Sequence, residues 1–281
     1  MTLALLALIL VRLVAKPRPS PPAEASIDAG TEPEGLIAQP IHSLRNEDIG
    51  SGKRFWVRNS LAGPIEVDCR LEDERNVQSD PALPRRMVLP ARAERELTAL
   101  RSLDAAQDSS AAVSCTAVVG RPDAVADSAA IYALPFYPGT DFTLEQGYGG
   151  AFSHHDPDSR YAIDLGVAEG TPVLAARDGV VMQLEQDFRG NGTDLQRDGA
   201  RANFVRILHD DGSMALYAHL APESTLVRMG DRVRTGDFLG KSGNTGYSTG
   251  PHLHFAVQVN DDMQLRSLPM TMTGVDLHAS R

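Results

Sequence analysis

The chain has little positive charge, few aromatic residues and only two cysteines. Its 27 Lys and Arg residues are outnumbered by 37 Asp and Glu residues, which gives a formal net charge of −10. A surface of this sign repels phosphate backbones and excludes general nucleic-acid binding. Aromatic residues make up 5% of the 281 residues, whereas glycine numbers 24 and proline 18. This turn-rich composition predicts an all-β fold of short strands.

The sequence also lacks a run of roughly 20 apolar residues, the length that a membrane-spanning helix needs. The shorter apolar stretch from Leu3 to Val11 is typical of a secretory signal, and the small residues Ala23 and Ala25 suit a cleavage site. Because no basic stretch precedes it, an uncleaved membrane anchor is the alternative. Residues 1–25 therefore predict export to the periplasm or cell envelope by either route.

The length predicts two domains joined to the amino-terminal segment by a linker. Six prolines lie between Lys16 and Pro40, which indicates a semi-extended Pro-rich linker over residues 26–40. Residues 41–135 are expected to form a small β-sandwich, with strand-like runs separated by turn residues. Residues 91–103 are ambiguous, since their leucines could line a helix. The strand-like runs are Phe55 to Asn59, Ile65 to Leu71, Ala111 to Val119 and Ala130 to Leu134.

The two cysteines, Cys69 and Cys115, lie in two of these runs. In an exported chain such a pair predicts a disulfide, which would stabilise the fold by about 4 kcal/mol in the chain-entropy model. Two buried free thiols are the alternative if the chain is not exported. The sequence has no Cys-x-x-Cys or Cys/His spacing that would bind a metal.

The second domain, residues 136–281, holds seven of the eight histidines and 18 of the 24 glycines. From His252 to Val259 apolar and polar residues alternate strictly, which puts His252 and His254 on one face of a strand. Asp164 lies in a similar run from Tyr161 to Val167. A third run, residues 214–220, predicts Ala215, Tyr217 and His219 on one face and the larger apolar residues on the other.

Two histidines and a carboxylate are the three protein ligands of a hydrolytic zinc site, whose fourth position is left to water. Zinc at such a site polarises a carbonyl and activates water. The chain has no His-Glu-x-x-His sequence, which excludes the helical arrangement of many zinc proteases. The residues therefore favour a zinc site built on strands.

Several motifs in order resemble the lysostaphin/LytM family of zinc endopeptidases. The resemblance covers about residues 136–259 and implies a compact, mostly antiparallel β fold with a long groove, and cleavage of peptidoglycan peptides. The motifs that carry it are Tyr161-Ala-Ile-Asp164, Gly170-Thr-Pro-Val173, Ala175 to Val181, Tyr217-Ala-His-Leu220, Ser242-Gly-Asn-Thr-Gly246 and Gly250-Pro-His-Leu-His-Phe255.

Carried over position by position, the resemblance implies that Asp164 and His254 are zinc ligands. His219 and His252 are then expected to form the catalytic pair. The stretch Asp187 to Ala202 is expected to be a long loop beside the groove. Asn203 and Tyr217 are expected to contact the substrate.

The first ligand departs from the family pattern. The family often has a histidine four residues before the aspartate, but that position here is Arg160. The sequence Gly149-Gly-Ala-Phe-Ser-His154-His155 resembles a variant branch with Ser-His further upstream, which makes His154 the expected ligand. His155 is the alternative, and either choice requires the following loop to fold the imidazole over Asp164.

The resulting hypothesis is an exported zinc endopeptidase that hydrolyses amide bonds in peptidoglycan stem peptides or cross-bridges. The alternative is a non-catalytic domain of the same family that binds the cell wall or activates another hydrolase. Such a domain is expected to have lost ligands or catalytic histidines, whereas here only the first ligand is displaced. The constellation therefore favours the enzyme.

Overall fold

The structure is a computed structural model that describes residues 7–13 and 40–277. Strands dominate it, and the helix assigned in the described part of the chain is the four-residue α1, Leu195–Asp198. The all-β prediction is therefore confirmed. The expected cleavage site at Ala23 and Ala25 and all but the last residue of the Pro-rich linker lie outside the described residues. Within the described ranges, no helix has the length and apolarity needed to cross a membrane.

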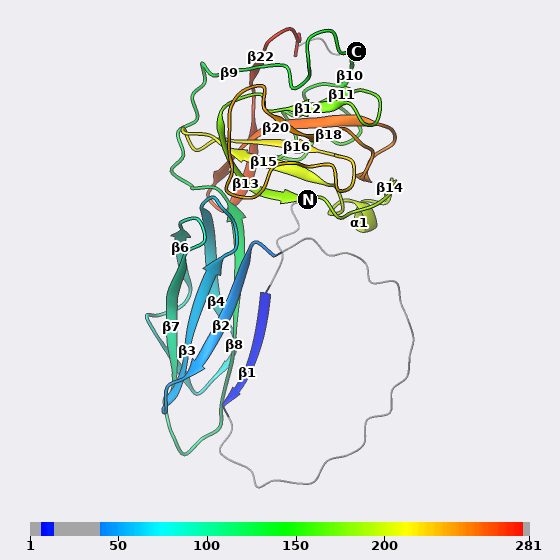
Figure 1. Cartoon of the computed structure of the whole chain (residues 1–281). Helices are drawn as coiled ribbons and strands as arrows, with labels where there is room; N and C mark the ends of the chain where they lie inside the picture. The colour runs from blue at the N-terminus through cyan, green and yellow to red at the C-terminus, as the bar shows by residue number, and fades with distance from the viewer. Residues whose placement is uncertain (1–6, 14–39, 278–281) are drawn as a thin grey trace.

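The first half of the chain forms two four-stranded sheets, seen as the lower, blue to green part of Figure 1. One sheet has the order β1-β8-β4-β6 and the other the order β2-β3-β7-β5. The strands are β1 (Ala7–Leu13), β2 (His42–Asp48), β3 (Gly52–Asn59), β4 (Ile65–Arg75), β5 (Val77–Asp80), β6 (Arg85–Leu89), β7 (Glu94–Ser102) and β8 (Ser109–Val119).

One apolar cluster fills the space between these two sheets. Phe55 and Leu97 enter it from one sheet and Val67 and Val113 from the other, and all four are fully buried. Side chains that alternate inward from both sheets are the arrangement of a β-sandwich. The same cluster continues into the second half through Met182, Met214 and Leu265. The domain boundary at residue 135 stays a prediction, because the apolar core crosses it.

Residue type alone did not predict the secondary structure of two segments in the first half. Most of the ambiguous residues 91–103 form strand β7 (Glu94–Ser102), because β3 and β5 pair with it on both sides. The apolar amino-terminal run supplies β1, which pairs antiparallel with β8 at the edge of the sheet. Export of the chain stays a prediction.

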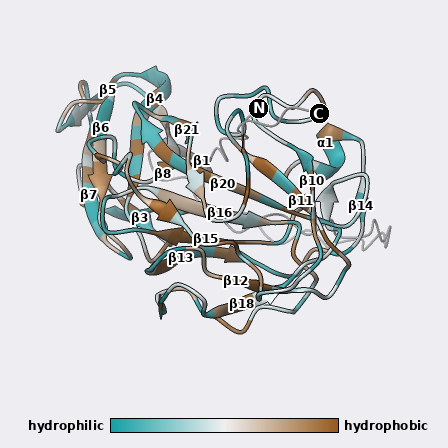
Figure 2. Cartoon of the chain, turned by 90° about the horizontal axis from the view of Figure 1, so that it is seen from above, coloured by the Kyte–Doolittle hydropathy of each residue, from teal (hydrophilic) through white to brown (hydrophobic). Residues whose placement is uncertain are grey.

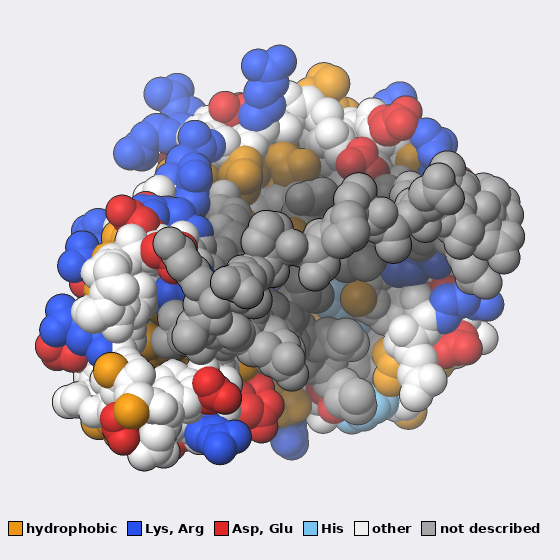
Figure 3. All heavy atoms as spheres, turned by 90° about the horizontal axis from the view of Figure 1, so that it is seen from below, with side chains coloured by type: hydrophobic (Ala, Val, Ile, Leu, Met, Phe, Trp, Pro, Cys, Tyr) orange, Lys and Arg blue, Asp and Glu red, His pale blue; other side chains and the backbone are white. Residues whose placement is uncertain are grey.

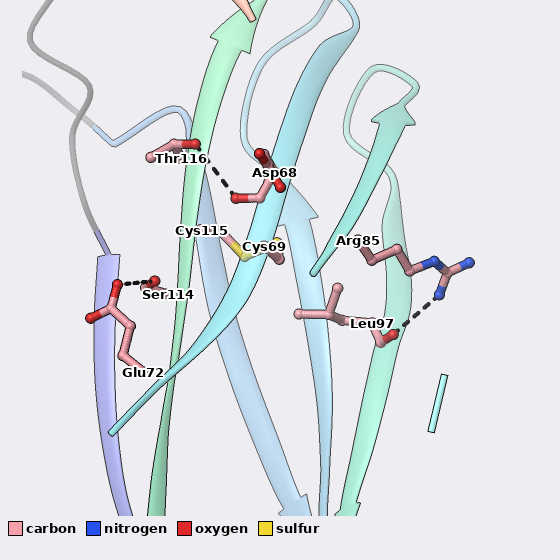
Figure 4. Close-up of a disulfide and its surroundings, with 8 residues drawn as sticks. All are labelled: Asp68, Cys69, Glu72, Arg85, Leu97, Ser114, Cys115 and Thr116. Carbon is pink, nitrogen blue, oxygen red and sulfur yellow. Dashed lines mark hydrogen bonds between the residues drawn. A yellow bond between two sulfur atoms is a disulfide. The ribbon is translucent and has the colours of Figure 1, made fainter. Parts of the chain in front are cut away.

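The disulfide between Cys69 and Cys115 is present, as predicted. The two residues lie directly opposite each other in the antiparallel register of β4 and β8, with their Cα atoms 4.1 Å apart. Figure 4 shows the bond between the two strands, beside the hydrogen bond that Ser114 Oγ donates to Glu72 Oε1 at 2.6 Å. The disulfide thus joins the two central strands of its sheet.

The second half is built on one large antiparallel sheet of eight strands. Seven of them follow the order β10-β11-β20-β16-β15-β13-β17, and β21 pairs with the far part of β20. Their bounds are β10 (Thr143–Gln146), β11 (Ile163–Gly166), β13 (Gly179–Glu185), β15 (Phe204–Leu208), β16 (Met214–Ala218), β17 (Arg232–Val233), β20 (His252–Asp261) and β21 (Gln264–Leu268).

Three short strand pairs flank this sheet. The expected strand at residues 130–134 is reduced to two residues in β9. The expected loop from Asp187 to Ala202 contains β14 and α1. The pairs are β12 (Pro172–Leu174) with β18 (Phe238–Lys241), β14 (Asn191–Gly192) with β19 (Gly246–Tyr247), and β9 (Ile131–Tyr132) with β22 (Thr271–Met272).

The core of the second half lies against one face of the large sheet. Ile163, Tyr217 and Phe255 are fully buried there, and Figure 2 shows the hydrophobic character of β13 and β15. Burying this face fixes the strand register, because a slip of one residue would turn every side chain to the other side. The opposite face is therefore free to carry polar side chains.

Candidate functional site

Asp164, His252 and His254 come from two neighbouring strands and project from the same face of the sheet. In the antiparallel register of β11 and β20, Asp164 lies opposite His254 and Gly166 lies opposite His252. Side chains directly opposite each other in a ladder share a face. The alternation read from the sequence therefore brings both imidazoles to the face that carries the aspartate.

His154 joins this group from a series of turns and not from a strand. Its Nε2 lies 3.2 Å from Asp164 Oδ1 and 3.3 Å from His254 Nδ1. The His154 side chain is fully buried, whereas the adjacent His155 is exposed. The turns at residues 151–160 fold the first of the two imidazoles back over the aspartate. Of the two candidate first ligands, the structure brings His154 to the site.

The donor atoms of these residues fit a divalent metal ion. His154 Nδ1 lies 2.9 Å from the carbonyl oxygen of Gly147, which can only accept, so Nδ1 carries the proton and Nε2 of the neutral ring presents a lone pair. This lone pair, His254 Nδ1 and a carboxylate oxygen of Asp164 all lie within 4.8 Å of one another. Such electron-rich atoms repel unless a cation or protons lie between them. Two ring nitrogens and one carboxylate oxygen are a set of ligands that Zn²⁺ accepts.

The electrostatics of Asp164 agree with this interpretation. Burial by itself raises the pKa of Asp164, but the adjacent imidazoles of His154 and His254 outweigh burial and lower the pKa well below its ordinary value. The carboxylate is therefore ionised at neutral pH, which is the form that binds a metal.

His219 and His252 lie beside the three donor residues. Their ring centroids are 4.5 Å apart, and His252 Nε2 lies 3.7 Å from Asp164 Oδ1. His219 Nδ1 donates to the carbonyl oxygen of Thr245 at 2.7 Å, and His252 Nδ1 donates to that of Gly250 at 2.8 Å. Both rings are thereby held with Nε2 as the free acceptor when they are neutral.

His219 stays neutral over the physiological range. Burial, followed by the neighbouring imidazoles of His252 and His254, lowers the pKa of His219 to about 3, against the opposing effect of the Thr245 carbonyl. A neutral imidazole with Nδ1–H fixed presents Nε2 as a hydrogen-bond acceptor. The arrangement thus places an acceptor nitrogen next to the group of donor atoms.

The alternation predicted for residues 214–220 is confirmed from Met214 to Ala218, but the placement of His219 on the face of Tyr217 is wrong. Ala218, not Tyr217, lies opposite His254 in the register of β16 and β20. His219 follows the end of the strand and has a φ of +64°. This left-handed conformation breaks the alternation, so His219 reaches the site although Tyr217 does not.

The substrate contact predicted for Tyr217 is contradicted by its position. Its side chain is fully buried in the core on the opposite face. The backbone N–H of Ala176 donates to the Tyr217 hydroxyl at 2.7 Å, and the ring packs edge-on against Phe255. Tyr217 therefore fixes the core behind the site.

Asn203 is also too buried to touch a substrate. Its Oδ1 accepts a hydrogen bond from Phe188 N at 2.9 Å, and its Nδ2 donates to the carbonyl oxygens of Phe188 at 2.9 Å and Leu220 at 3.2 Å. The Asn203 side chain is fully buried. It holds the loop after β13 and the backbone next to His219, so its role is to position the site from behind.

Several functional contacts were missed at the sequence level. Thr245 and Gly250 act through backbone carbonyls, which any residue type supplies, so the sequence carries no signal for them. Ser248 Oγ adds a contact with His252 Nδ1 at 3.3 Å. Gln146 Nε2 donates to Asp164 Oδ2 at 2.9 Å. The one sequence feature that could have pointed to Gln146 is its position as a polar residue at the end of a strand, just before a glycine-rich turn.

Known proteins resemble part of the chain. The DD-carboxypeptidase/endopeptidase Mpg of Neisseria meningitidis serogroup B is 41% identical over 98 residues, which are 35% of this chain and 20% of that protein. The glycyl-glycine endopeptidase ALE-1 of Staphylococcus capitis is 35% identical over 115 residues, which are 41% of this chain and 28% of that protein. The chain therefore spans less than a third of either relative. The solved structure of lysostaphin from Staphylococcus simulans is 32% identical over 42% of this chain and 43% of its own, with a TM-score of 0.32.

Residues 158–265 match the profile of peptidase family M23. Asp164, His219, His252 and His254 lie inside the matched stretch, whereas His154 lies just before it. The match therefore does not extend to His154, and the exposed Arg160 occupies the position where the family often has its ligand. The resemblance inferred from the motifs is confirmed, because residues 158–265 match the model of peptidase family M23.

Proposed function

We propose that this protein is an exported zinc endopeptidase that hydrolyses amide bonds in peptidoglycan stem peptides or cross-bridges. The observation that carries the proposal is the convergence of His154, Asp164 and His254 beside two further imidazoles. His219 and His252 both have Nδ1 held by a backbone carbonyl, which leaves Nε2 for chemistry. A degenerate domain would have no reason to keep all five side chains in this arrangement.

His154 Nε2, Asp164 Oδ1 and His254 Nδ1 would hold the zinc ion. When bound there, Zn²⁺ supplies Lewis acidity that polarises the substrate carbonyl and makes water a nucleophile at neutral pH. The proton released by the attacking water would be taken at Nε2 of His219 or His252. Once protonated, that same nitrogen becomes a donor that stabilises the tetrahedral oxyanion or protonates the leaving amine.

A cavity near the site would take part of a peptide substrate. It has a volume of about 470 Å³ and is lined by Gly166 and Pro251, close in sequence to Asp164 and His252, but by none of the five site residues. On the face shown in Figure 3, a few histidine atoms are visible, and acidic and basic side chains are distributed over the rest of that face. Since the net charge of −10 gives no attraction to an anionic wall, specificity would come from contacts in the groove.

The compartment is inferred from the disulfide and from the relatives. The Cys69–Cys115 bond persists in an oxidising environment, which supports the periplasm or cell envelope as the location. Two of the relatives described above are named a DD-carboxypeptidase/endopeptidase and a glycyl-glycine endopeptidase, which supports a peptide substrate. Whether residues 1–25 are cleaved or retained as an anchor does not alter the chemistry of the site.

A digestion experiment tests the proposal directly. The full chain, purified without chelator, is assayed for zinc content and incubated with isolated peptidoglycan, and the released peptides are identified by mass spectrometry. We expect roughly one zinc per chain and new amino termini in the wall peptides. The variant Asp164→Ala, expected to lose both, is the control. Zinc binding with wall binding but no cleavage would favour the non-catalytic alternative, and failure to take up added zinc would refute the enzyme.

A further inference from the structure

Gln146, the last residue of β10, is brought opposite Asp164 by a β-bulge. Leu144 pairs with Leu165 in the expected register, the register then shifts, and Gln146 pairs with Asp164. Without the shift, Glu145 would lie opposite Asp164, and two carboxylates facing each other across a ladder are destabilising. The bulge places a neutral amide there instead, which is a common use of bulges beside functional sites.

The amide of Gln146 uses all of its hydrogen-bonding capacity. Its Nε2 donates to Asp164 Oδ2 and to Ser153 Oγ, both at 2.9 Å. Its Oε1 accepts from the backbone N–H groups of Phe152 at 3.0 Å and Ser153 at 3.4 Å. One side chain therefore binds the aspartate and the segment immediately before His154 at the same time.

The loop that carries His154 packs closely on Gln146. A Cβ atom added at Gly150 would clash with Gln146 Cγ, so a larger residue there would have to displace the Gln146 side chain. His154 itself donates from Nδ1 to the carbonyl of Gly147, the residue that follows Gln146. The loop is thus bound both to the Gln146 side chain and to the backbone of the next residue, Gly147.

The two oxygens of the Asp164 carboxylate have different partners. Oδ1 faces His154 Nε2 at 3.2 Å and His254 Nδ1 at 2.9 Å, whereas Oδ2 faces Gln146. Holding one oxygen by a neutral donor fixes the rotation of the carboxylate and leaves the other oxygen for a ligand bond. Such outer contacts orient metal ligands and are worth about 10–100-fold in metal affinity.

We propose that Gln146 is a positioning residue that holds Asp164 and the His154 loop in ligand geometry, an inference that rests on the proposed zinc function. His154 is ten residues from Asp164 in sequence and stands on turns, so no strand pairing fixes the distance between them. The Gln146 amide supplies that missing constraint. It allows a histidine from a loop to serve at a position where a strand histidine is absent.

The test is the zinc affinity of Gln146→Leu, which keeps the apolar stem and removes both the donor and the acceptor. Zinc affinity is measured by competition with a chelator, and the rate of zinc loss is measured after chelator is added in excess. We expect affinity about 10–100-fold weaker than in the unsubstituted protein and a faster loss of zinc. Amide hydrogen exchange at Phe152 and Ser153 in the metal-free protein should also accelerate, since their acceptor is gone.

The matched control is Glu145→Gln, the neighbouring bulge residue, whose carboxylate lies over Gly166 and makes no contact with Asp164 among the hydrogen bonds of the described residues. It should keep zinc affinity within about twofold of the unsubstituted protein, whereas Gln146→Leu at saturating zinc should recover turnover to within about tenfold. If Gln146→Leu does not fold, Gln146→Asn replaces it, because the same amide one methylene shorter cannot reach both partners. Unchanged affinity and unchanged zinc loss in the folded variant would overturn this proposal alone, whereas an unsubstituted protein that binds no zinc would overturn the proposed function as well.

Discussion

The carboxylate of Glu66 on β4 accepts a hydrogen bond from Asn260 Nδ2 on β20 at 2.8 Å. Glu66 also accepts from the backbone N–H of Met263 at 3.2 Å, and its side chain is buried. The strand that carries His252 and His254 at one end is therefore bound at its other end by the first half of the chain. Among the described residues, the contacts that Glu66 makes with the second half therefore lie at the end of β20 away from the histidines.

Removing this carboxylate should destabilise the protein without affecting the site. In Glu66→Ala the Asn260 amide and the Met263 N–H lose a buried acceptor, which typically costs about 1–3 kcal/mol. We expect a lower midpoint in denaturant unfolding, with zinc content and turnover unchanged. Glu66→Gln, which retains an acceptor oxygen, should lose less. If the unsubstituted protein, Glu66→Ala and Glu66→Gln unfold at the same denaturant concentration, the hydrogen bonds of Glu66 do not stabilise the contact between the two halves.

Much of the fold and site follows from the sequence because strand alternation is a local rule. Because side chains alternate between the two faces of a strand, His252 and His254 are predicted on one face. The disulfide between Cys69 and Cys115 is predicted from two strand-like runs and an oxidising compartment. His219 lies beyond the reach of this rule. Its φ of +64° ends the alternation after Ala218, and this backbone conformation cannot be predicted from a histidine at that position.

Burial and register account for the other differences. Asn203 and Tyr217 are polar residues in motifs of the family, but both are fully buried, and their polar atoms bond to backbone groups. Gln146 faces Asp164 through a bulge, and a one-residue register shift cannot be read from residue types on one strand. Such long-range pairings require the folded chain.

The roles of ligands and catalytic histidines should separate on substitution. Asp164→Ala and His254→Ala remove donor atoms and should abolish both zinc binding and activity. His219→Ala and His252→Ala should keep zinc nearly intact while lowering turnover by about 10²–10⁴-fold, since these imidazoles are expected to move protons. Metal analysis and kinetics on the same preparations decide the matter. Loss of zinc in His219→Ala would move that residue into the ligand set.

Reduction of the disulfide should destabilise the first half and spare the site. Opening the link between Cys69 and Cys115, which are 46 residues apart, should cost about 4 kcal/mol in the chain-entropy model. The bond lies in the sheets of the first half, so zinc should remain bound under non-denaturing reduction. Unfolding with and without reductant, followed by zinc analysis, measures both effects. Mass mapping that finds two free thiols in protein from the cell envelope would contradict the premise.

Asp211 should make stability depend on acid pH. Burial alone raises the pKa of Asp211, but hydrogen bonds from Ser213, Arg177 and the backbone of Asp127 outweigh it and lower the pKa. A carboxyl with a lowered pKa contributes its full stability above its unfolded value of about 3.9 and loses that contribution as the pH falls towards the folded value. We expect Asp211→Asn to cost about 1–2 kcal/mol at pH 7, after allowance for partial solvent access, and the difference to shrink below about pH 4. Unfolding free energies of both proteins from pH 7 to pH 2 test this, and a constant difference would contradict it.

The last prediction concerns which of the adjacent histidines, His154 or His155, is the first zinc ligand. His154 is fully buried, with Nε2 3.2 Å from Asp164 Oδ1, whereas His155 is exposed and outside the group of donor atoms. We therefore expect His154→Ala to lose zinc, because two protein ligands hold the ion too weakly. His155→Ala should retain zinc and change activity by less than about tenfold, which corresponds to about 1.4 kcal/mol in the barrier. Zinc content of the two purified variants distinguishes them directly. If His155→Ala is the metal-free protein, the ligand shifts by one residue and the chemistry survives; if both keep tightly bound zinc, the first ligand lies elsewhere and the geometric assignment of His154 is wrong.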